Sequence, residues 1–197
     1  MRQSKQTRQL IKALNINKAF LLGTGMFSVV TEHTGVSVLK HTICPAFPEF
    51  MEQPMEDQLE EPFFVRGSYI DHEEVTINGY DYTACTYELP KLRKVAMKDM
   101  SPKQRRIVRD WKQFLLLTAN HKHLHRYRQH AEELVEEVFG KYEESFKINL
   151  VNLIRSLDNS FRLDIAPSNR PMLNDQDQLV IFDPVFCRKT SYKLNSY

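Results

Sequence analysis

The chain has 197 residues, of which 42% are hydrophobic and 26% are charged, and its net charge is +2. This length and composition predict one globular domain or one compact two-lobed unit, and they exclude collagen-like and low-complexity chains. No apolar run approaches the roughly 18 residues of a transmembrane helix, and the N-terminal residues contain no stretch suited to a secretory signal. The three cysteines are widely spaced, so we expect a reducing cytoplasm and neither a disulfide framework nor a zinc site.

Charge is distributed unevenly along the chain. Residues 1–18 carry five basic groups and no acid, residues 49–61 carry six acids and no base, and residues 91–128 carry twelve Lys/Arg against two Asp. Such blocks can steer an oppositely charged partner. The simpler interpretation of each block is the solvated face of a helix or loop.

Short apolar runs in the first half predict a small sheet. A helix is expected over residues 5–15, where apolar side chains share one face. Strands are expected to follow it over residues 19–22, 27–30, 36–40, 63–70 and 80–87. The acidic, proline-containing residues 45–62 predict a loop or short helix. Asn78-Gly79 predicts a tight turn before the last strand, with residues 73–77 pairing within that hairpin.

Helical periodicity dominates the second half. Ser101-Pro102 predicts a helix start, with serine as the N-cap and proline at the first helical position. From there to about residue 158 there is no proline and only Gly140, and apolar residues recur at helical spacing. Short strands are expected again over 162–164 and 179–182. These elements predict an α+β fold: a small sheet, then helices, then a compact tail of loops and strands.

Two signals typical of nucleotide binding lie in the predicted sheet. The segment G-T-G-M-F-S, residues 23–28, joins two strands, and its glycines let the backbone approach a phosphate closely. Lys40 ends an apolar strand soon afterwards and would supply a cation for the α- and β-phosphates. Each signal is weak by itself, because an ordinary β-hairpin or an edge lysine explains it equally well.

The third motif is more specific. Asp164 and Asn169 lie five residues apart, and Asp183 follows fourteen residues later at the end of an apolar strand. This spacing resembles the catalytic centre of protein kinases, where the first Asp orients the attacking hydroxyl and the Asn and second Asp hold Mg²⁺ on the nucleotide phosphates. Turn-forming residues explain either loop alone. The joint order of glycine loop, strand lysine and both loops favours a kinase-like architecture.

The resemblance narrows to one family. The segments LLGTGMFSVV, VLK, DIAPSNRPM and VIFDPV look like the early serine/threonine protein kinase of the autographiviruses, short-tailed bacteriophages that encode their own RNA polymerase. That family likewise has G-x-G-x-F-S, a strand-end lysine and D-P-V where most kinases have D-F-G. The motifs cover residues 20–40 and 161–186, and residues 41–160 match only by the order of their elements.

The resemblance implies a fold, an activity and a set of residues. The fold is a reduced two-lobed protein-kinase-like fold, with an N-terminal lobe over 1–88 and a helical C-terminal lobe over 89–197. The activity is transfer of the γ-phosphate of ATP, with Mg²⁺, to Ser/Thr of host proteins during phage takeover in the cytoplasm of the infected bacterium. Catalysis is implied for Asp164 and Lys40, and metal binding for Asn169 and Asp183. The implied ATP-binding residues are Gly23, Thr24, Gly25, Ser28, Lys40, Glu88 and Leu89.

The last two of these residues follow Tyr87 in the implied hinge, which would contact adenine through backbone groups. The chain also departs from the kinase pattern. Ser28 replaces the third loop glycine, and Ala166 stands where a lysine usually contacts the γ-phosphate, so slow turnover is expected. The chain ends fourteen residues after Asp183, so residues 101–158 would have to supply substrate contacts. The carboxylate that pairs with Lys40 is expected among Glu49, Glu52, Glu56, Glu60 and Glu61.

Other functions remain as alternatives. One is a pseudokinase-like interaction module that binds and inhibits a host protein, such as RNA polymerase or a defence system, and another is a small-molecule phosphotransferase. Nucleic-acid binding through 91–128 is a weaker alternative, because Trp111 and Tyr127 are only scattered aromatics there. His121 and His125 have the spacing of a helical metal pair, but the neighbouring Lys and Arg would repel a cation, which favours a solvated basic helix. No membrane partner is expected.

Overall fold

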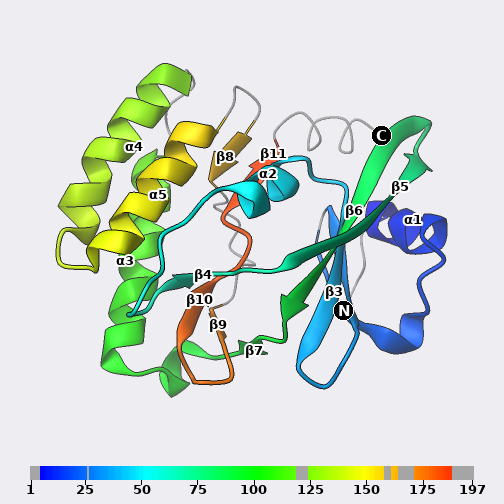
Figure 1. The fold of residues 1–197 in the computed structure, drawn as a ribbon, viewed down its shortest axis with the longest axis horizontal. Coiled ribbons are helices and arrows are strands. Elements are labelled where there is room, and N and C mark those ends of the chain that lie inside the picture. Colours follow the sequence, from blue (N-terminus) through cyan, green and yellow to red (C-terminus); the bar gives the residue numbers. More distant parts are fainter. Residues whose placement is uncertain (1–4, 26, 119–123, 158–160, 164–170, 188–197) are drawn as a thin grey trace. The chain divides into compact units, whose positions relative to one another are not determined.

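The computed structural model describes residues 5–25, 27–118, 124–157, 161–163 and 171–187. Their contacts divide the chain into two compact units. The first comprises Met1–Met51, Arg66–Lys91 and Cys187–Tyr197, and the second comprises Glu52–Val65 and Leu92–Phe186. An antiparallel sheet dominates the first unit and helices dominate the second, so the fold is α+β as expected (Figure 1).

The first unit is built on a five-stranded antiparallel sheet in the order β1-β2-β3-β6-β5. Its strands are β1 (Leu21–Thr24), β2 (Ser28–Glu32), β3 (Ser37–Thr42), β5 (Ser68–Ile77) and β6 (Tyr80–Pro90). Its helices are α1 (Lys5–Ala13), the 3-10 turn η1 (Lys18–Phe20) and α2 (Ala46–Glu52). Asn78 and Gly79 have φ values of 54° and 78°, which confirms the predicted tight turn between β5 and β6.

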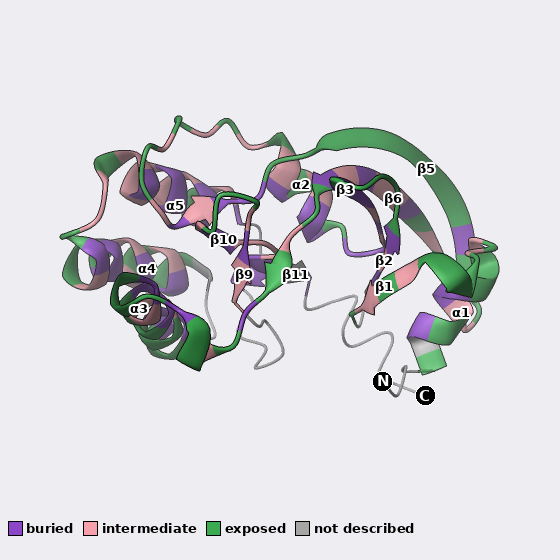
Figure 2. Ribbon diagram, turned by 90° about the horizontal axis from the view of Figure 1, so that it is seen from below, coloured by how far each residue is buried: buried purple, intermediate pink, exposed green. Residues whose placement is uncertain are grey.

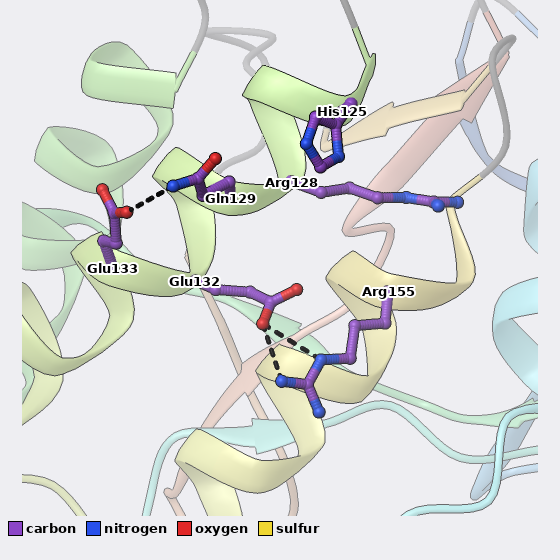
Figure 3. A pocket seen from close by; sticks show the side chains of 6 residues that line it. All are labelled: His125, Arg128, Gln129, Glu132, Glu133 and Arg155. Atoms are coloured by element: carbon purple, nitrogen blue, oxygen red, sulfur yellow. Dashed lines mark hydrogen bonds and ion pairs between the residues drawn. The ribbon is translucent and has the colours of Figure 1, made fainter.

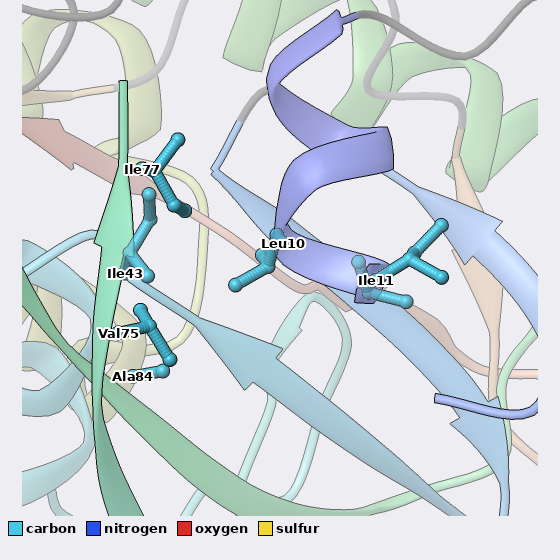
Figure 4. Close-up of a cluster of buried hydrophobic side chains, with 7 residues drawn as sticks. Leu10, Ile11, Ile43, Val75, Ile77 and Ala84 are labelled. Carbon is cyan, nitrogen blue, oxygen red and sulfur yellow. The ribbon is translucent and has the colours of Figure 1, made fainter. Parts of the chain in front are cut away.

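The two faces of this sheet are covered by different helices. Leu10 and Ile11 of α1 pack on one face, against the buried side chains of Val29, Ile43, Val75, Ile77 and Ala84 (Figure 4). Phe47 of α2 packs edge-on against Tyr87 of β6, with 5.4 Å between the ring centroids. Tyr87 lies three positions after Ala84 on β6, and neighbouring residues of a strand face opposite sides. The contact between Phe47 and Tyr87 therefore covers the face of the sheet opposite to α1. Most of β5 stays exposed, and Figure 2 shows burial only towards its end.

The prediction of one continuous strand over residues 63–70 is wrong. Phe63–Phe64 forms β4 in the second unit, where it pairs in parallel with β10 (Leu179–Ile181). The next amide, that of Val65, donates to the Ile181 carbonyl at 2.9 Å. The chain then changes sheets before β5 begins at Ser68. An apolar run cannot reveal such a change, because the residue types do not show which partner strand each half of the run pairs with.

Gly67 lies at this change of sheets and is packed against β6. A Cβ atom at Gly67 would come within 2.3 Å of the Glu88 carbonyl oxygen and of Leu89 Cδ2. Gly67→Ala is therefore expected to destabilise the protein by about 1–3 kcal/mol, because the backbone of β6 must shift to accept the methyl group. The thermal unfolding midpoint measures this loss. Gly35→Ala is the matched control, since a Cβ there meets nothing within 4 Å, and equal midpoints for the two variants would contradict the prediction.

The second unit combines helices with two small sheets. Its helices are η2 (Met97–Asp99), α3 (Pro102–Thr118), α4 (Leu124–Phe139) and α5 (Glu144–Ser156). Its strands are β4, β7 (Arg93–Lys94), β8 (Phe161–Leu163), β9 (Met172–Leu173), β10 and β11 (Val185–Cys187). One sheet has the order β4-β10-β9-β7, and the other pairs β11 with β8. The expected boundary between residues 88 and 89 lies near the observed one at Lys91, but Glu52–Val65 belongs to the second unit.

The start of α3 follows the predicted cap. The Ser101 hydroxyl accepts a hydrogen bond from the Gln104 amide at 3.1 Å, and the Gln104 side-chain oxygen accepts one from the Ser101 amide at 3.1 Å. This reciprocal pair satisfies two helix-end amides at once. Phe114, which α3 carries into the interior, lies 5.3 Å centroid to centroid from Phe139 of α4. Trp111 packs beside both rings, so this aromatic residue belongs to the core.

Candidate functional site

The predicted glycine loop is a hairpin turn between β1 and β2. Gly23 and Thr24 lie in β1, Ser28 begins β2, and the Gly25 amide donates to the Ser28 carbonyl at 2.8 Å. The buried hydroxyl of Thr7 in α1 donates to the Gly25 carbonyl at 2.9 Å. Helix α1 thus fixes one peptide of the turn. No signal in the sequence pointed to Thr7, because this contact joins residues 18 positions apart.

Lys40 lies in the central strand of the sheet and is buried. Its side chain is 4% exposed, and its register partners are Val30 on β2 and Tyr87 on β6. The Lys40 ammonium lies 3.6 Å from the centroid of the Phe47 ring, within the range of a cation–π contact. This position excludes the edge-lysine interpretation. A buried ammonium is costly unless it interacts favourably. Lys40 is therefore not an ordinary surface lysine that only keeps the protein soluble.

The acidic segment has its own anchors in the second unit. Asn149, which is fully buried, accepts from the Glu56 amide at 2.6 Å and donates to the Glu56 carbonyl at 2.9 Å. Glu60 pairs with Lys103 at 2.9 Å, and the carboxylate of Glu61 accepts from the Leu179 amide at 2.8 Å. Two of the five candidate partners of Lys40 therefore have other contacts.

Among the remaining candidates, Glu49 lies on α2, two residues after Phe47 and in the same unit as Lys40. The pairing of Lys40 with a carboxylate of residues 49–61 stays a prediction. The acidic segment is also held through Glu143, whose carboxylate accepts from the amides of Leu59 and Glu60, both at 2.9 Å. Partial burial opposes ionisation of Glu143, but these hydrogen bonds outweigh it and lower the pKa of the carboxyl.

The expected hinge is the end of strand β6. Tyr87, Glu88 and Leu89 pair with Lys40, Leu39 and Val38 of β3. The pairing with β5 begins at Glu88, opposite Ser68, so Leu89 lies one residue beyond it. In the described strands, Leu89 is thus paired on one side only.

Asp183 has an unusual backbone in the second unit. It follows β10, is half-buried, and has a φ of 138°, which residues with a side chain rarely adopt. Such a conformation costs on the order of 1–3 kcal/mol and persists only where the surrounding structure determines it. Pro184 follows at once, and β11 begins at Val185. Strain of this kind concentrates at functional sites, which makes Asp183 a stronger candidate than its turn-forming residue type suggests.

Two strand pairings relate the segments around the predicted catalytic loops. Strand β8 ends at Leu163, directly before Asp164, and pairs with β11, which begins two residues after Asp183. Strands β9 and β10 form the hairpin between the two loops, with Leu179 opposite Leu173. Asp164, Ala166 and Asn169 themselves lie outside the described residues. The chain segments on both sides of these loops are therefore joined within one unit.

A tyrosine of α4 supports strand β8. The Leu163 amide donates to the Tyr127 hydroxyl at 3.3 Å, and the Arg162 guanidinium lies 5.0 Å from the centre of the Tyr127 ring. Tyr127 is 2% exposed, and this burial raises the pKa of its phenol. The ring is therefore inaccessible for base stacking, which argues against nucleic-acid binding through Tyr127. Sequence gave no sign of this role, since Tyr127 lies in a basic stretch 36 residues from Leu163.

The remaining sequence expectations concern metal and membrane. Among the described residues, no group of three or more His, Cys, Asp or Glu side chains is arranged to hold a metal ion. His125 is exposed on α4, while His121 and His123 lie outside the described residues. Within the described part of the chain, no helix has the length and hydrophobicity needed to span a membrane.

No protein-family model matches the chain, and no curated protein sequence matches it. The motif spacing and the geometry of each unit therefore carry the functional assignment.

Proposed function

We propose that the protein is a serine/threonine protein kinase that uses ATP and Mg²⁺ and modifies host proteins of an infected bacterium. Asp164 would orient the acceptor hydroxyl and take its proton. Lys40 would bind phosphate oxygens, and Asn169 with Asp183 would hold the metal. The metal, when bound, neutralises charge on the phosphates. The turn at Gly23 and Gly25 would cover the nucleotide.

One observation carries the proposal, which is the backbone of Asp183. This residue has a φ of 138° and lies between β10, which pairs with β9, and β11, which pairs with β8. These two pairings flank both of the predicted catalytic loops. A carboxylate oxygen is the kind of ligand that Mg²⁺ prefers. Asp183 is half-buried, so its charge acts where water screens it less. Simple turn formation does not account for a strained aspartate, because glycine would adopt this backbone conformation at lower cost.

The first unit supports the proposal independently. Lys40 is buried on a central strand, next to the helix that follows that strand. The β1–β2 turn is held at Gly25 by Thr7. The class of host and the Ser/Thr acceptor come from the family resemblance alone. Ala166 removes the usual γ-phosphate contact, so the proposed rate is low.

Transfer of radiolabel from ATP to proteins of a bacterial lysate tests the proposal. The expected result is Mg²⁺-dependent label in acid-precipitable protein, which Asp164→Asn reduces by orders of magnitude. Asp175→Asn is the matched control, because Asp175 is exposed in the turn between β9 and β10, and we expect it to retain activity. Label that appears in a new acid-soluble product other than ATP and inorganic phosphate, and not in protein, would instead indicate a small-molecule phosphotransferase.

A binding module is the second candidate, and the acidic segment favours it. Leu59 is 86% exposed, although Glu143 and Asn149 hold the backbone on both sides of it. A fixed loop that presents an apolar side chain among acids is suited to a basic protein partner. Nucleotide binding without transfer, together with capture of one host protein that Leu59→Asp abolishes, would favour this function over the kinase.

A further inference from the structure

The helical unit carries a pocket of about 410 Å³ on α4 and α5 (Figure 3). It is lined by His125, Arg128, Gln129, Glu132, Glu133 and Arg155. None of these side chains belongs to the residues proposed to bind ATP or metal. A pocket of this size is within the range that holds small ligands, and it is larger than a single oxyanion requires.

Both acidic groups of the pocket already have partners. Arg155 donates from Nε and Nη2 to one oxygen of Glu132, at 3.0 and 2.7 Å. The Gln129 amide donates to the Glu133 carboxylate at 3.1 Å. Figure 3 shows these two bonded pairs. The Arg155 charge is thus balanced by Glu132, and the second amide hydrogen of Gln129 remains for another acceptor.

Arg128 differs from these residues. Its Nε is enclosed by protein, yet it has no hydrogen-bond partner among the described residues. An enclosed donor without an acceptor is unfavourable, and more so when it belongs to a charged group. His125 lies three residues earlier on α4, on the same helix face. It contributes at least one ring N–H in either protonation state.

We propose that this pocket binds a phosphate monoester group, with Arg128 as its principal ligand. Because Nε is enclosed, the two terminal nitrogens of the guanidinium would present the parallel N–H donors that match two oxygens of a phosphate, and such charge-assisted bonds are strong. His125 and Gln129 would supply further donors, and the remaining volume would hold the organic part of the ligand. The site goes beyond the proposed kinase activity, since no transfer step involves these residues. The monoester comes from a phosphorylated protein side chain or from a small phosphorylated molecule.

Calorimetric titration of the full chain with inorganic phosphate, at constant ionic strength, tests the site. Saturable binding is expected, and Arg128→Ala should weaken it about tenfold or more. The matched control is Arg126→Ala, which removes an exposed charge from the same helix outside the pocket and should change affinity less than about twofold. Arg128→Lys keeps the charge without the paired donors, so it should also weaken binding, and it serves as the test if the alanine variant does not fold.

Two further probes show whether the phosphate monoester belongs to a protein side chain or to a small molecule. Tighter binding of a phosphoserine peptide than of glucose 6-phosphate indicates a protein side chain, and the reverse order indicates a small molecule. The unphosphorylated peptide and glucose should not bind. The proposal is overturned if phosphate does not saturate the protein, or if the folded Arg128 variants bind phosphate as tightly as the unmodified chain. It is also overturned if Arg126→Ala lowers the affinity for phosphate as much as Arg128→Ala does.

Discussion

Asp183→Ala is expected to abolish Mg²⁺-dependent phosphoryl transfer while the chain stays folded. As a metal ligand, the Asp183 carboxylate would help to hold Mg²⁺, which would neutralise charge on the phosphates, and loss of such a ligand typically lowers the rate by several orders of magnitude. Alanine cannot replace the ligand, and at a φ of 138° it carries the same kind of backbone strain as aspartate. Transfer rates at saturating ATP and Mg²⁺, with circular dichroism as a check of folding, measure the effect.

A glycine at the same position separates the metal-binding role of Asp183 from its backbone role. Asp183→Gly also removes the carboxylate, but glycine adopts positive φ without strain. We expect Asp183→Gly to be as inactive as Asp183→Ala and to unfold at a higher temperature than the alanine variant. Undiminished transfer by either folded variant would sink the assignment of Asp183 as a metal ligand. Equal unfolding midpoints for the two variants would show that the backbone strain is small.

Lys40→Met is expected to lower transfer by about a hundredfold or more, because the cation that would bind the phosphates is lost. Methionine has a similar length and suits the buried position beside Phe47. The protein loses the cation–π contact and the other interactions of the ammonium group, but it no longer buries a charge, so we expect the methionine variant to stay folded. Activity and stability should therefore respond very differently, which a purely structural lysine would not produce.

The matched control is Lys91→Met. Lys91 is an exposed lysine that follows β6 and pairs with Glu32 at 2.8 Å. Exposed pairs of this kind contribute little, so transfer should be retained. The role assigned to Lys40 fails if its folded methionine variant transfers phosphate as fast as the Lys91 variant. It also fails if both variants lose activity together, because any surface lysine would then be equally important.

Local signals in the sequence determined much of the secondary structure. The Asn78-Gly79 turn, the Ser101 cap and the amphipathic helix at the N-terminus depend on neighbouring residues, and the structure contains all three. The α+β class follows from the change of apolar periodicity along the chain. The motifs that resemble those of kinases are also local, since each one is a fixed spacing of a few residues.

Only the tertiary structure decided what depends on residues far apart. It buried Lys40 beside Phe47, divided the apolar run after Pro62 between two sheets, and brought Tyr127 to the Leu163 amide. It also strained the backbone of Asp183, which no residue pattern reveals. Sequence patterns report which side chains prefer to be buried, but not which distant partner buries them. That choice depends on the joint packing of all elements, where burial, pairing and chain geometry must be satisfied together.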